Sequence, residues 1–161
     1  MPDLSEKQLR GRNSAKVHAL PLPLRKKPPP TLPDYAELHC LTNFSFQRGA
    51  STPEEMVERA YQLGYTALAI TDECSVAGIV RAHVCLRDLP AKLEEHERDH
   101  PDEPPLPRNP DFRLLFGSEF RFERFRLVVI ANDTEGWGNL CEFITAARNT
   151  ELPKGEYRVS W

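Results

Sequence analysis

The sequence predicts an α/β fold, in which parallel strands alternate with helices. Residues 37–41 are short and alternate in polarity like a strand, and the C-terminal end of this segment carries His39. A helical pattern follows from Thr52, and residues 66–71 then form a second strand-like segment that is apolar without strict alternation. Strand, helix and strand within about 35 residues make a βαβ unit, which is typical of α/β folds.

The helix after the turn at residues 49–50 has the clearest signal in the chain. Thr52 can cap the helix, Pro53 suits its first position, and Glu55 completes a Thr-x-x-Glu capping box. Gly64 is placed to end the helix. Four apolar residues fall on one face between these limits: Met56, Val57, Ala60 and Leu63.

The later elements are predicted from pattern and proline content. A second helix is expected over residues 76–88, with Pro90 interrupting it and residues 91–100 forming a charged helical extension. Five prolines make residues 101–110 a loop. Three strand candidates and one amphipathic helix complete the chain: residues 112–116, 118–123 and 126–131, then Leu140, Phe143, Ile144 and Ala147.

Charge and proline content divide the 161 residues into a tail and a body. Residues 1–34 are predicted to be a disordered, basic, proline-rich tail, and residues 35–161 to be ordered. Residues 1–33 carry about +5, which leaves about −8 on the rest of the chain from a net charge of −3. An acidic body does not suit contact with nucleic-acid phosphates, so any DNA contact is expected elsewhere in a longer protein. The tail itself is interpreted as a linker or an upstream start, with a DNA-binding arm or a polyproline ligand as alternatives.

The sequence also bears on location. There is no apolar segment of signal-peptide type near the start, and no run of about 18 apolar residues that could span a membrane. The four cysteines contain no C-x-x-C pair. A cytoplasmic protein with reduced thiols and no membrane partner is therefore expected.

Two stretches resemble a known family. Residues 35–50 read YAELHCLTNFSFQRGA, and residues 69–78 read AITDECSVAG. They are similar to the opening of a PHP (polymerase and histidinol phosphatase) domain, and more narrowly to the N-terminus of bacterial C-family DNA polymerases (DNA polymerase III alpha-like) on the error-prone branch. Residues 138–140, 144–148 and 154–158 support the same resemblance. It implies a PHP-type (β/α) barrel of which roughly the first half is present, so residues 35–161 are expected to be the N-terminal part of a PHP domain in a truncated product.

The resemblance implies a metal site at the strand ends, where imidazoles and carboxylates hold cations that activate water for phosphoester hydrolysis. Such polymerases with an intact site carry a second histidine at the position of Leu41, an aspartate at the position of Arg48 and a histidine at the position of Glu73. Here these positions have changed, whereas His39 and Glu119 are retained.

The retained groups define a vestigial site. His39, Glu73 and Glu119 are its remaining candidate metal ligands, with Leu41 and Asp72 lining it. For His39, a hydrogen bond to a neighbour is favoured over a ligand role because its partners are lost. We expect Arg48 to stand in for a metal between Glu73 and Glu119, since two buried carboxylates require a counter-charge.

By resemblance, the leading reading is the N-terminal PHP segment of an error-prone DNA polymerase that serves DNA repair and translesion synthesis. The segment itself would be structural, with the remainder of the polymerase chain as its partner and DNA reached through the parent enzyme. No cofactor is expected here beyond a residual divalent ion, whereas Mg²⁺ is expected for the parent. The palm carboxylates are absent, so whether this chain is an enzyme stays open. The alternatives are a free-standing PHP metal-dependent phosphoesterase and a non-catalytic polymerase-binding module.

Overall fold

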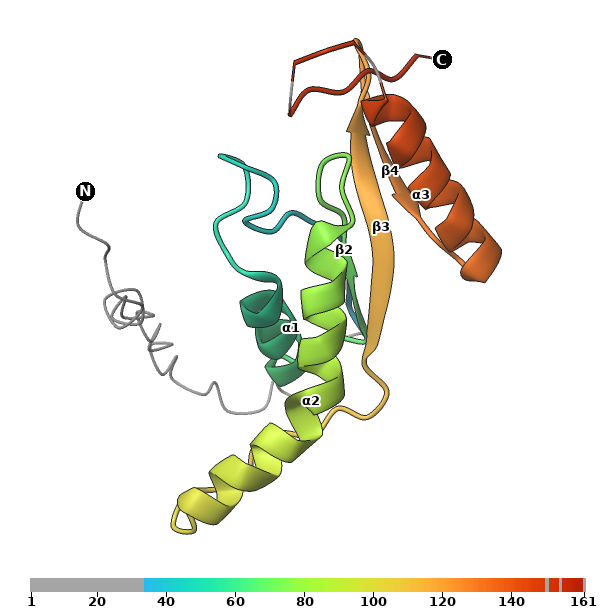
Figure 1. The fold of residues 1–161 in the computed structure, drawn as a ribbon. Helices are drawn as coiled ribbons and strands as arrows, with labels where there is room; N and C mark the ends of the chain where they lie inside the picture. The colour runs from blue at the N-terminus through green and yellow to red at the C-terminus, as the bar shows by residue number, and fades with distance from the viewer. Residues whose placement is uncertain (1–33, 150, 154, 161) are drawn as a thin grey trace, which may run out of the picture.

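A computed structural model describes residues 34–149, 151–153 and 155–160 (Figure 1). The predicted tail, residues 1–34, lies almost wholly outside these described residues. The elements in chain order are β1 (Ala36–Cys40), α1 (Pro53–Gln62), β2 (Ala67–Ile70), α2 (Ala77–Asp99), β3 (Arg113–Arg121), β4 (Arg126–Ile130) and α3 (Thr134–Arg148). Within the described ranges, none of the helices has the length and apolar character needed to cross a membrane.

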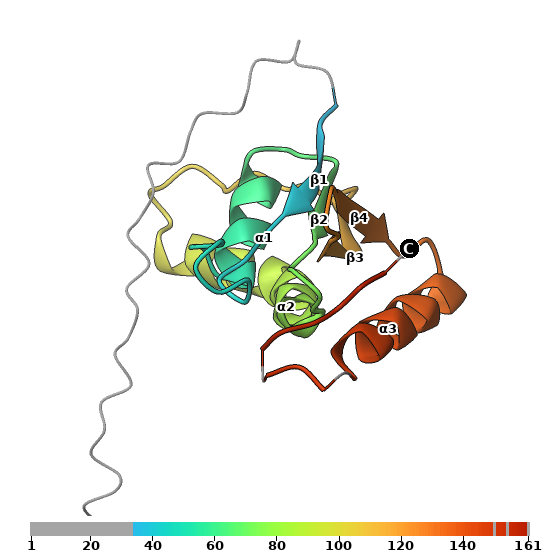
Figure 2. The same ribbon diagram turned by 90° about the horizontal axis from the view of Figure 1, so that it is seen from above.

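The four strands form one sheet in the order β1-β2-β3-β4. Strands β1, β2 and β3 run parallel, and β4 returns antiparallel to β3. All three helices lie on the same side of this sheet in the view from above (Figure 2). The predicted α/β class and partial barrel are therefore confirmed.

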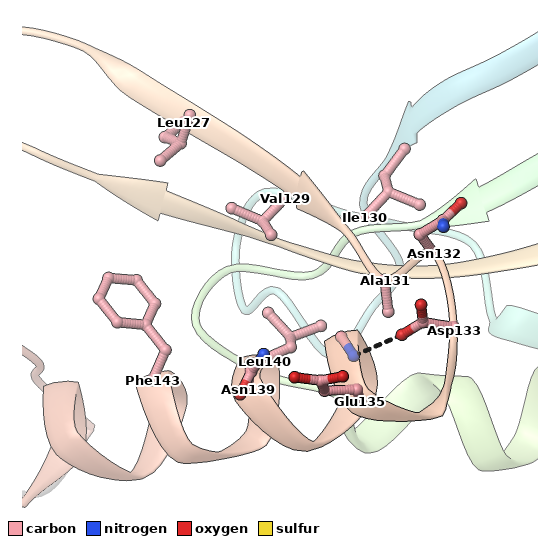
Figure 3. A pocket seen from close by; sticks show the side chains of 11 residues that line it. Leu127, Val129, Ile130, Ala131, Asn132, Asp133, Glu135, Asn139, Leu140 and Phe143 are labelled. Carbon is pink, nitrogen blue, oxygen red and sulfur yellow. Dashed lines mark hydrogen bonds between the residues drawn. The ribbon is translucent and has the colours of Figure 1, made fainter.

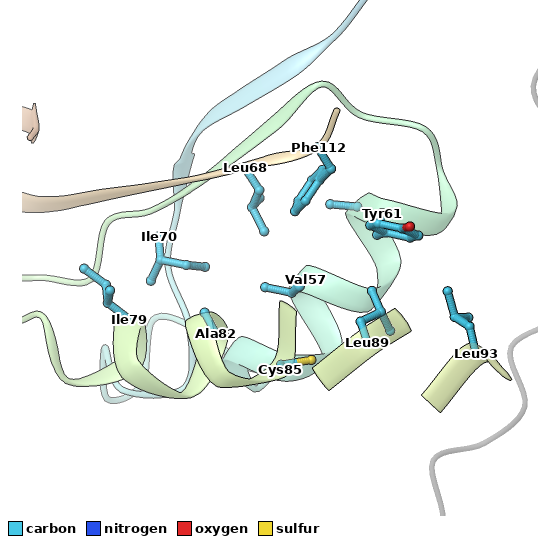
Figure 4. Close-up of a cluster of buried hydrophobic side chains, with 11 residues drawn as sticks. Val57, Tyr61, Leu68, Ile70, Ile79, Ala82, Cys85, Leu89, Leu93 and Phe112 are labelled. Atoms are coloured by element: carbon cyan, nitrogen blue, oxygen red, sulfur yellow. The ribbon is translucent and has the colours of Figure 1, made fainter. Parts of the chain in front are cut away.

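The main core lies between the sheet and the first two helices (Figure 4). Leu68 and Ile70 of β2 point toward Val57 of α1 and toward the buried side of α2. A second cluster fixes α3 against β3, where Phe120 packs with Leu140. Because the parallel strands are anchored from the helical side, their C-terminal ends are held in fixed register for the site described below.

Helix α1 is capped as predicted. The hydroxyl of Thr52 accepts a hydrogen bond from the backbone N–H of Glu55 at 3.2 Å. The carboxylate of Glu55 in turn accepts from the backbone N–H of Thr52 at 2.8 Å. After the helix, Gly64 has a φ of 77°, a left-handed conformation that favours glycine.

The predicted break at Pro90 is wrong, because α2 continues through it. Leu89 and Leu93 are both buried in the main core, which keeps the chain helical on either side of the proline. The helix instead changes direction near its middle (Figure 1). A bend of this kind is the usual effect of a proline that removes one hydrogen bond from a helix.

The predicted separation of residues 112–116 from 118–123 is also wrong. Both belong to β3, a single strand of nine residues that changes partner along its length. Its first half pairs with β2, and from Gly117 onward it pairs with β4. A side chain at Gly117 would meet the carbonyl oxygen of Val129 at 2.5 Å, so the glycine permits the close approach of β4.

Candidate functional site

The site begins with a loop that is anchored on a buried carboxylate. Asp72 follows β2 and is only 1% exposed. Its Oδ1 accepts hydrogen bonds from the backbone N–H of Thr42 at 2.7 Å and from the hydroxyl of Ser45 at 2.6 Å. Its Oδ2 accepts from the hydroxyl of Thr42 at 2.7 Å. Asp72, which the sequence analysis placed in the lining of the site, thus fixes the start of the loop that follows β1.

The same loop carries Arg48 back toward the sheet. Ser45 accepts hydrogen bonds through its carbonyl from the backbone N–H groups of Arg48 at 2.9 Å and Gly49 at 3.0 Å. The turn is so tight that a Cβ at Gly49 would lie 1.9 Å from the carbonyl oxygen of Thr42. Only glycine fits there, and the turn directs Arg48 to the strand ends.

The two glutamates are brought together where β2 runs on beside β3. The backbone N–H of Cys74 donates to the carbonyl of Glu119 at 2.8 Å, and Glu73 and Glu119 form a parallel bridge. In return, the N–H of Glu119 lies 3.2 Å from the carbonyl of Asp72. This pairing places the side chains of Glu73 and Glu119 side by side, although 46 positions separate them in the chain.

Arg48 bridges the two glutamates. Its Nη1 lies 2.6 Å from Oε2 of Glu73 and 2.5 Å from Oε1 of Glu119. The side chain of Glu119 is fully buried, and that of Glu73 is 15% exposed. Both therefore depend on a counter-charge for their ionised form.

The electrostatics of the pair follow from this bridge. Burial by itself raises the pKa of Glu119, but hydrogen bonds from Arg48 and His39 outweigh it and hold that pKa below its ordinary value. Burial also opposes ionisation of Glu73, whereas Arg48 and Tyr157 lower its pKa overall. The hydrogen bond to Glu119 raises the pKa of Arg48, so the guanidinium stays charged.

His39 completes the contacts of Glu119. Its Nε2 lies 2.7 Å from Oε2 of Glu119, and its side chain is 45% exposed. The histidine at the end of β1 is therefore paired with the carboxylate of Glu119.

Three further residues belong to the site but were missed from the sequence. The hydroxyl of Tyr157 donates to Oε1 of Glu73 at 2.9 Å and accepts from the backbone N–H of Arg121 at 2.8 Å. Nε of Arg121 lies 3.7 Å from Oε1 of Glu73, and Nε of Arg126 lies 3.9 Å from Oε1 of Glu119. Strand periodicity could have found Arg121, because it lies two positions after Glu119 and side chains two positions apart in a strand point to the same face. Tyr157 arrives from beyond α3, which no local pattern indicates.

The residues present do not fit a metal centre of the type that the resemblance implies. Leu41 offers only hydrocarbon, and the cationic nitrogen of Arg48 lies between the two carboxylates that a divalent ion would need. Among the described residues, no three His, Cys, Asp or Glu side chains are arranged as a metal-binding group. The vestigial ligand role of His39, Glu73 and Glu119 stays a prediction.

A separate pocket of about 560 Å³ lies between β4 and α3 (Figure 3). Leu127, Leu140 and Phe143 provide apolar walls. At one end Asp133 caps α3 by accepting from the N–H of Gly136 at 2.8 Å. None of the residues around Arg48 line this pocket, so it is distinct from the candidate site.

Comparisons with known proteins identify the family. The PHP domain profile matches residues 37–160. An error-prone DNA polymerase from Azoarcus sp. is 52% identical over 132 residues, which cover 79% of this chain and 12% of that protein. Those from Ralstonia nicotianae and Pseudomonas aeruginosa are 48% and 49% identical, over 80% and 78% of this chain and 10% of each relative. The chain thus spans about a tenth of the length of the relatives it matches.

Among solved structures, one from Bifidobacterium adolescentis, described as a proposed metal-dependent phosphoesterase, aligns with a TM-score of 0.42 and 22% identity. The alignment covers 75% of this chain and 36% of that one, and no argument about function rests on it. The family profile covers most of the chain, in agreement with the resemblance seen in its motifs. The chain belongs to the PHP domain family.

Proposed function

We propose that this chain is the PHP module of an error-prone DNA polymerase and that the module supports the polymerase without hydrolysing phosphoesters itself. The identity of about half of the aligned residues to three such polymerases supports the assignment. The parent enzyme would perform template-directed nucleotidyl transfer with Mg²⁺ in the cytoplasm, during repair and translesion synthesis. The remainder of the polymerase would be the partner of this module, and DNA would be bound through the parent.

One observation carries the non-hydrolytic role: Nη1 of Arg48 lies within hydrogen-bond distance of both Glu73 and Glu119. Metal-dependent hydrolysis needs an electrophilic cation with open positions for water and substrate. A guanidinium supplies the positive charge but has no open coordination position, so it cannot bind a water and lower its pKa to make a hydroxide. Arg48 would therefore preserve the fold around the strand ends while removing the hydrolytic chemistry.

Metal analysis tests this role. Purified protein dialysed against Zn²⁺ or Mn²⁺ should retain only substoichiometric metal, and EDTA should leave its melting temperature unchanged. It should also fail to hydrolyse a chromogenic phosphodiester in the presence of either ion. Stoichiometric metal, together with EDTA-sensitive hydrolysis, would instead support the free-standing phosphoesterase.

The polymerase assignment needs its own test, since the chain matches only a small part of each relative. Antibody raised to residues 35–161 should detect, in native cells after DNA damage, a band far above the 18.4 kDa of this chain. That outcome would direct further work to the polymerase core. A single band near 18.4 kDa would contradict the assignment and favour a stand-alone binding module.

A further inference from the structure

The site has two charged layers with opposite sign. The two glutamates form the inner layer, with side chains that are 0% and 15% exposed. Arg121 and Arg126 form the outer layer and are 64% and 57% exposed. Arg48 lies between the layers at 25% exposure. Three guanidinium groups thus surround two carboxylates, in a body that is otherwise acidic.

The inner carboxylates are already satisfied. The Oε1 and Oε2 atoms of Glu119 contact Arg48 and His39, and those of Glu73 contact Tyr157 and Arg48. Each of the four oxygens therefore has a close partner without help from the outer arginines. Nε of Arg121 and Nε of Arg126 lie 3.7 and 3.9 Å from these oxygens, beyond good hydrogen-bond distance. The Nε–H groups of these two exposed side chains can therefore turn to another acceptor.

The position of the two outer arginines is unfavourable on its own. Arg121 and Arg126 are directly opposite each other in the antiparallel register of β3 and β4. Like charges in directly opposite cross-strand positions destabilise a sheet. Arg126 and Arg48 also lie close to the same oxygen atom, Oε1 of Glu119. Nε of Arg126 is 3.9 Å from it, and Nη1 of Arg48 is 2.5 Å from it. An anion placed over the three groups would relieve this repulsion.

We propose that Arg48, Arg121 and Arg126 form a metal-independent binding site for a phosphate group. A phosphate carries nearly two negative charges and at least three acceptor oxygens, so it can engage three guanidinium groups at once. A carboxylate has two oxygens and one charge, which match fewer of these donors. The three arginines would bind the phosphate group, and Arg48 also takes the place of the metal that hydrolysis requires. The site would therefore bind a phosphate without hydrolysing it.

Titration of the full chain with sodium phosphate tests the proposal. Ionic strength is held constant with sodium chloride, because a general salt effect would also shift the NMR resonances of exposed arginines. The Nε–Hε resonances of Arg121 and Arg126 should shift with a saturating dependence on phosphate. The double variant Arg121→Gln/Arg126→Gln should weaken binding by about tenfold or more, because it removes charge-assisted hydrogen bonds. The control Arg113→Gln, at the far end of the same strand, should bind like the unmodified chain.

A second arm identifies the source of the phosphate. A 5′-phosphorylated oligonucleotide that binds more tightly than its 5′-hydroxyl counterpart would point to a nucleic-acid end. Equal affinity for inorganic phosphate and the phosphorylated strand would point to a free anion. A linear, unsaturated response shared by Arg113, or a double variant with unchanged affinity, would overturn the proposal. Neither of these results would affect the polymerase assignment, which rests on sequence identity.

Discussion

Replacing Arg48 by methionine is expected to lower the free energy of unfolding by about 3 kcal/mol, because it leaves two largely buried carboxylates without their shared cation. Methionine keeps much of the length and volume of the side chain, so the loss reports on charge and hydrogen bonding more than on packing. Urea denaturation followed by circular dichroism measures the change. A loss below about 1 kcal/mol would show that the bridge is not required by the fold.

Two controls separate the bridge from ion pairs in general. Arg48→Lys keeps a cation that can reach one carboxylate, and it should recover part of the lost stability. Arg81→Met removes an exposed pair, in which Nε lies 2.7 Å from Oε1 of Glu54. Since exposed pairs contribute little, this variant should lose less than about 1 kcal/mol. Equal losses from Arg48→Met and Arg81→Met would contradict the special role of Arg48.

The pH dependence of the Arg48→Met effect has a definite sign. In the native chain the pKa values of Glu73 and Glu119 are lowered, so their contribution is complete above the unfolded pKa and is lost as pH falls through the folded values. Without Arg48, burial is expected to raise both pKa values and to favour the protonated acids. The difference in stability between the variant and the native chain should therefore be largest near pH 8, narrow as pH falls, and close only below 4.5, where the native carboxylates also become protonated. A difference that widens on acidification would show that the carboxylates are not the groups concerned.

Local chemistry made much of the fold predictable. Thr52 and Glu55 form a capping box from residues three apart, and the observed bonds match that pattern. The capping box needed only residue type and spacing. The contact of Arg48 with two carboxylates was expected from the family resemblance, which places Arg48 at the position of a lost aspartate ligand, together with the requirement that buried charges be paired.

Other features depend on contacts between distant parts of the chain. Pro90 does not end α2, because Leu89 and Leu93 on either side are buried in a core formed with other elements. Tyr157 reaches Glu73 across 84 positions, and nothing near it in the sequence signals that contact. The exchange of partners along β3 at Gly117 likewise follows from how closely β4 approaches, which is a property of the assembled sheet.

Replacing Asp72 by alanine is expected to lower the free energy of unfolding by about 4 kcal/mol, since it removes the acceptor of three buried hydrogen bonds. Asp72→Asn is the matched control. Its remaining oxygen can still accept from the N–H of Thr42 and the hydroxyl of Ser45, so it should lose only about 1–2 kcal/mol. Chemical denaturation gives both values. If the two variants lose the same stability, the number of accepted bonds is not what matters at this position.

The same aspartate should also control Arg48 at a distance. Asp72 holds the loop, and the loop carbonyl of Ser45 fixes the backbone of Arg48 and Gly49. In Asp72→Ala, which removes the acceptor of the Ser45 hydroxyl, hydrogen exchange should therefore quicken at the N–H groups of Arg48 and Gly49. A double-mutant cycle joins the two predictions: if the loop positions Arg48, the loss from Arg48→Met should be smaller in the Asp72→Ala background than in the native chain. Additive losses would mean that Arg48 finds the two glutamates without the loop, and that the bridge depends on electrostatic attraction alone.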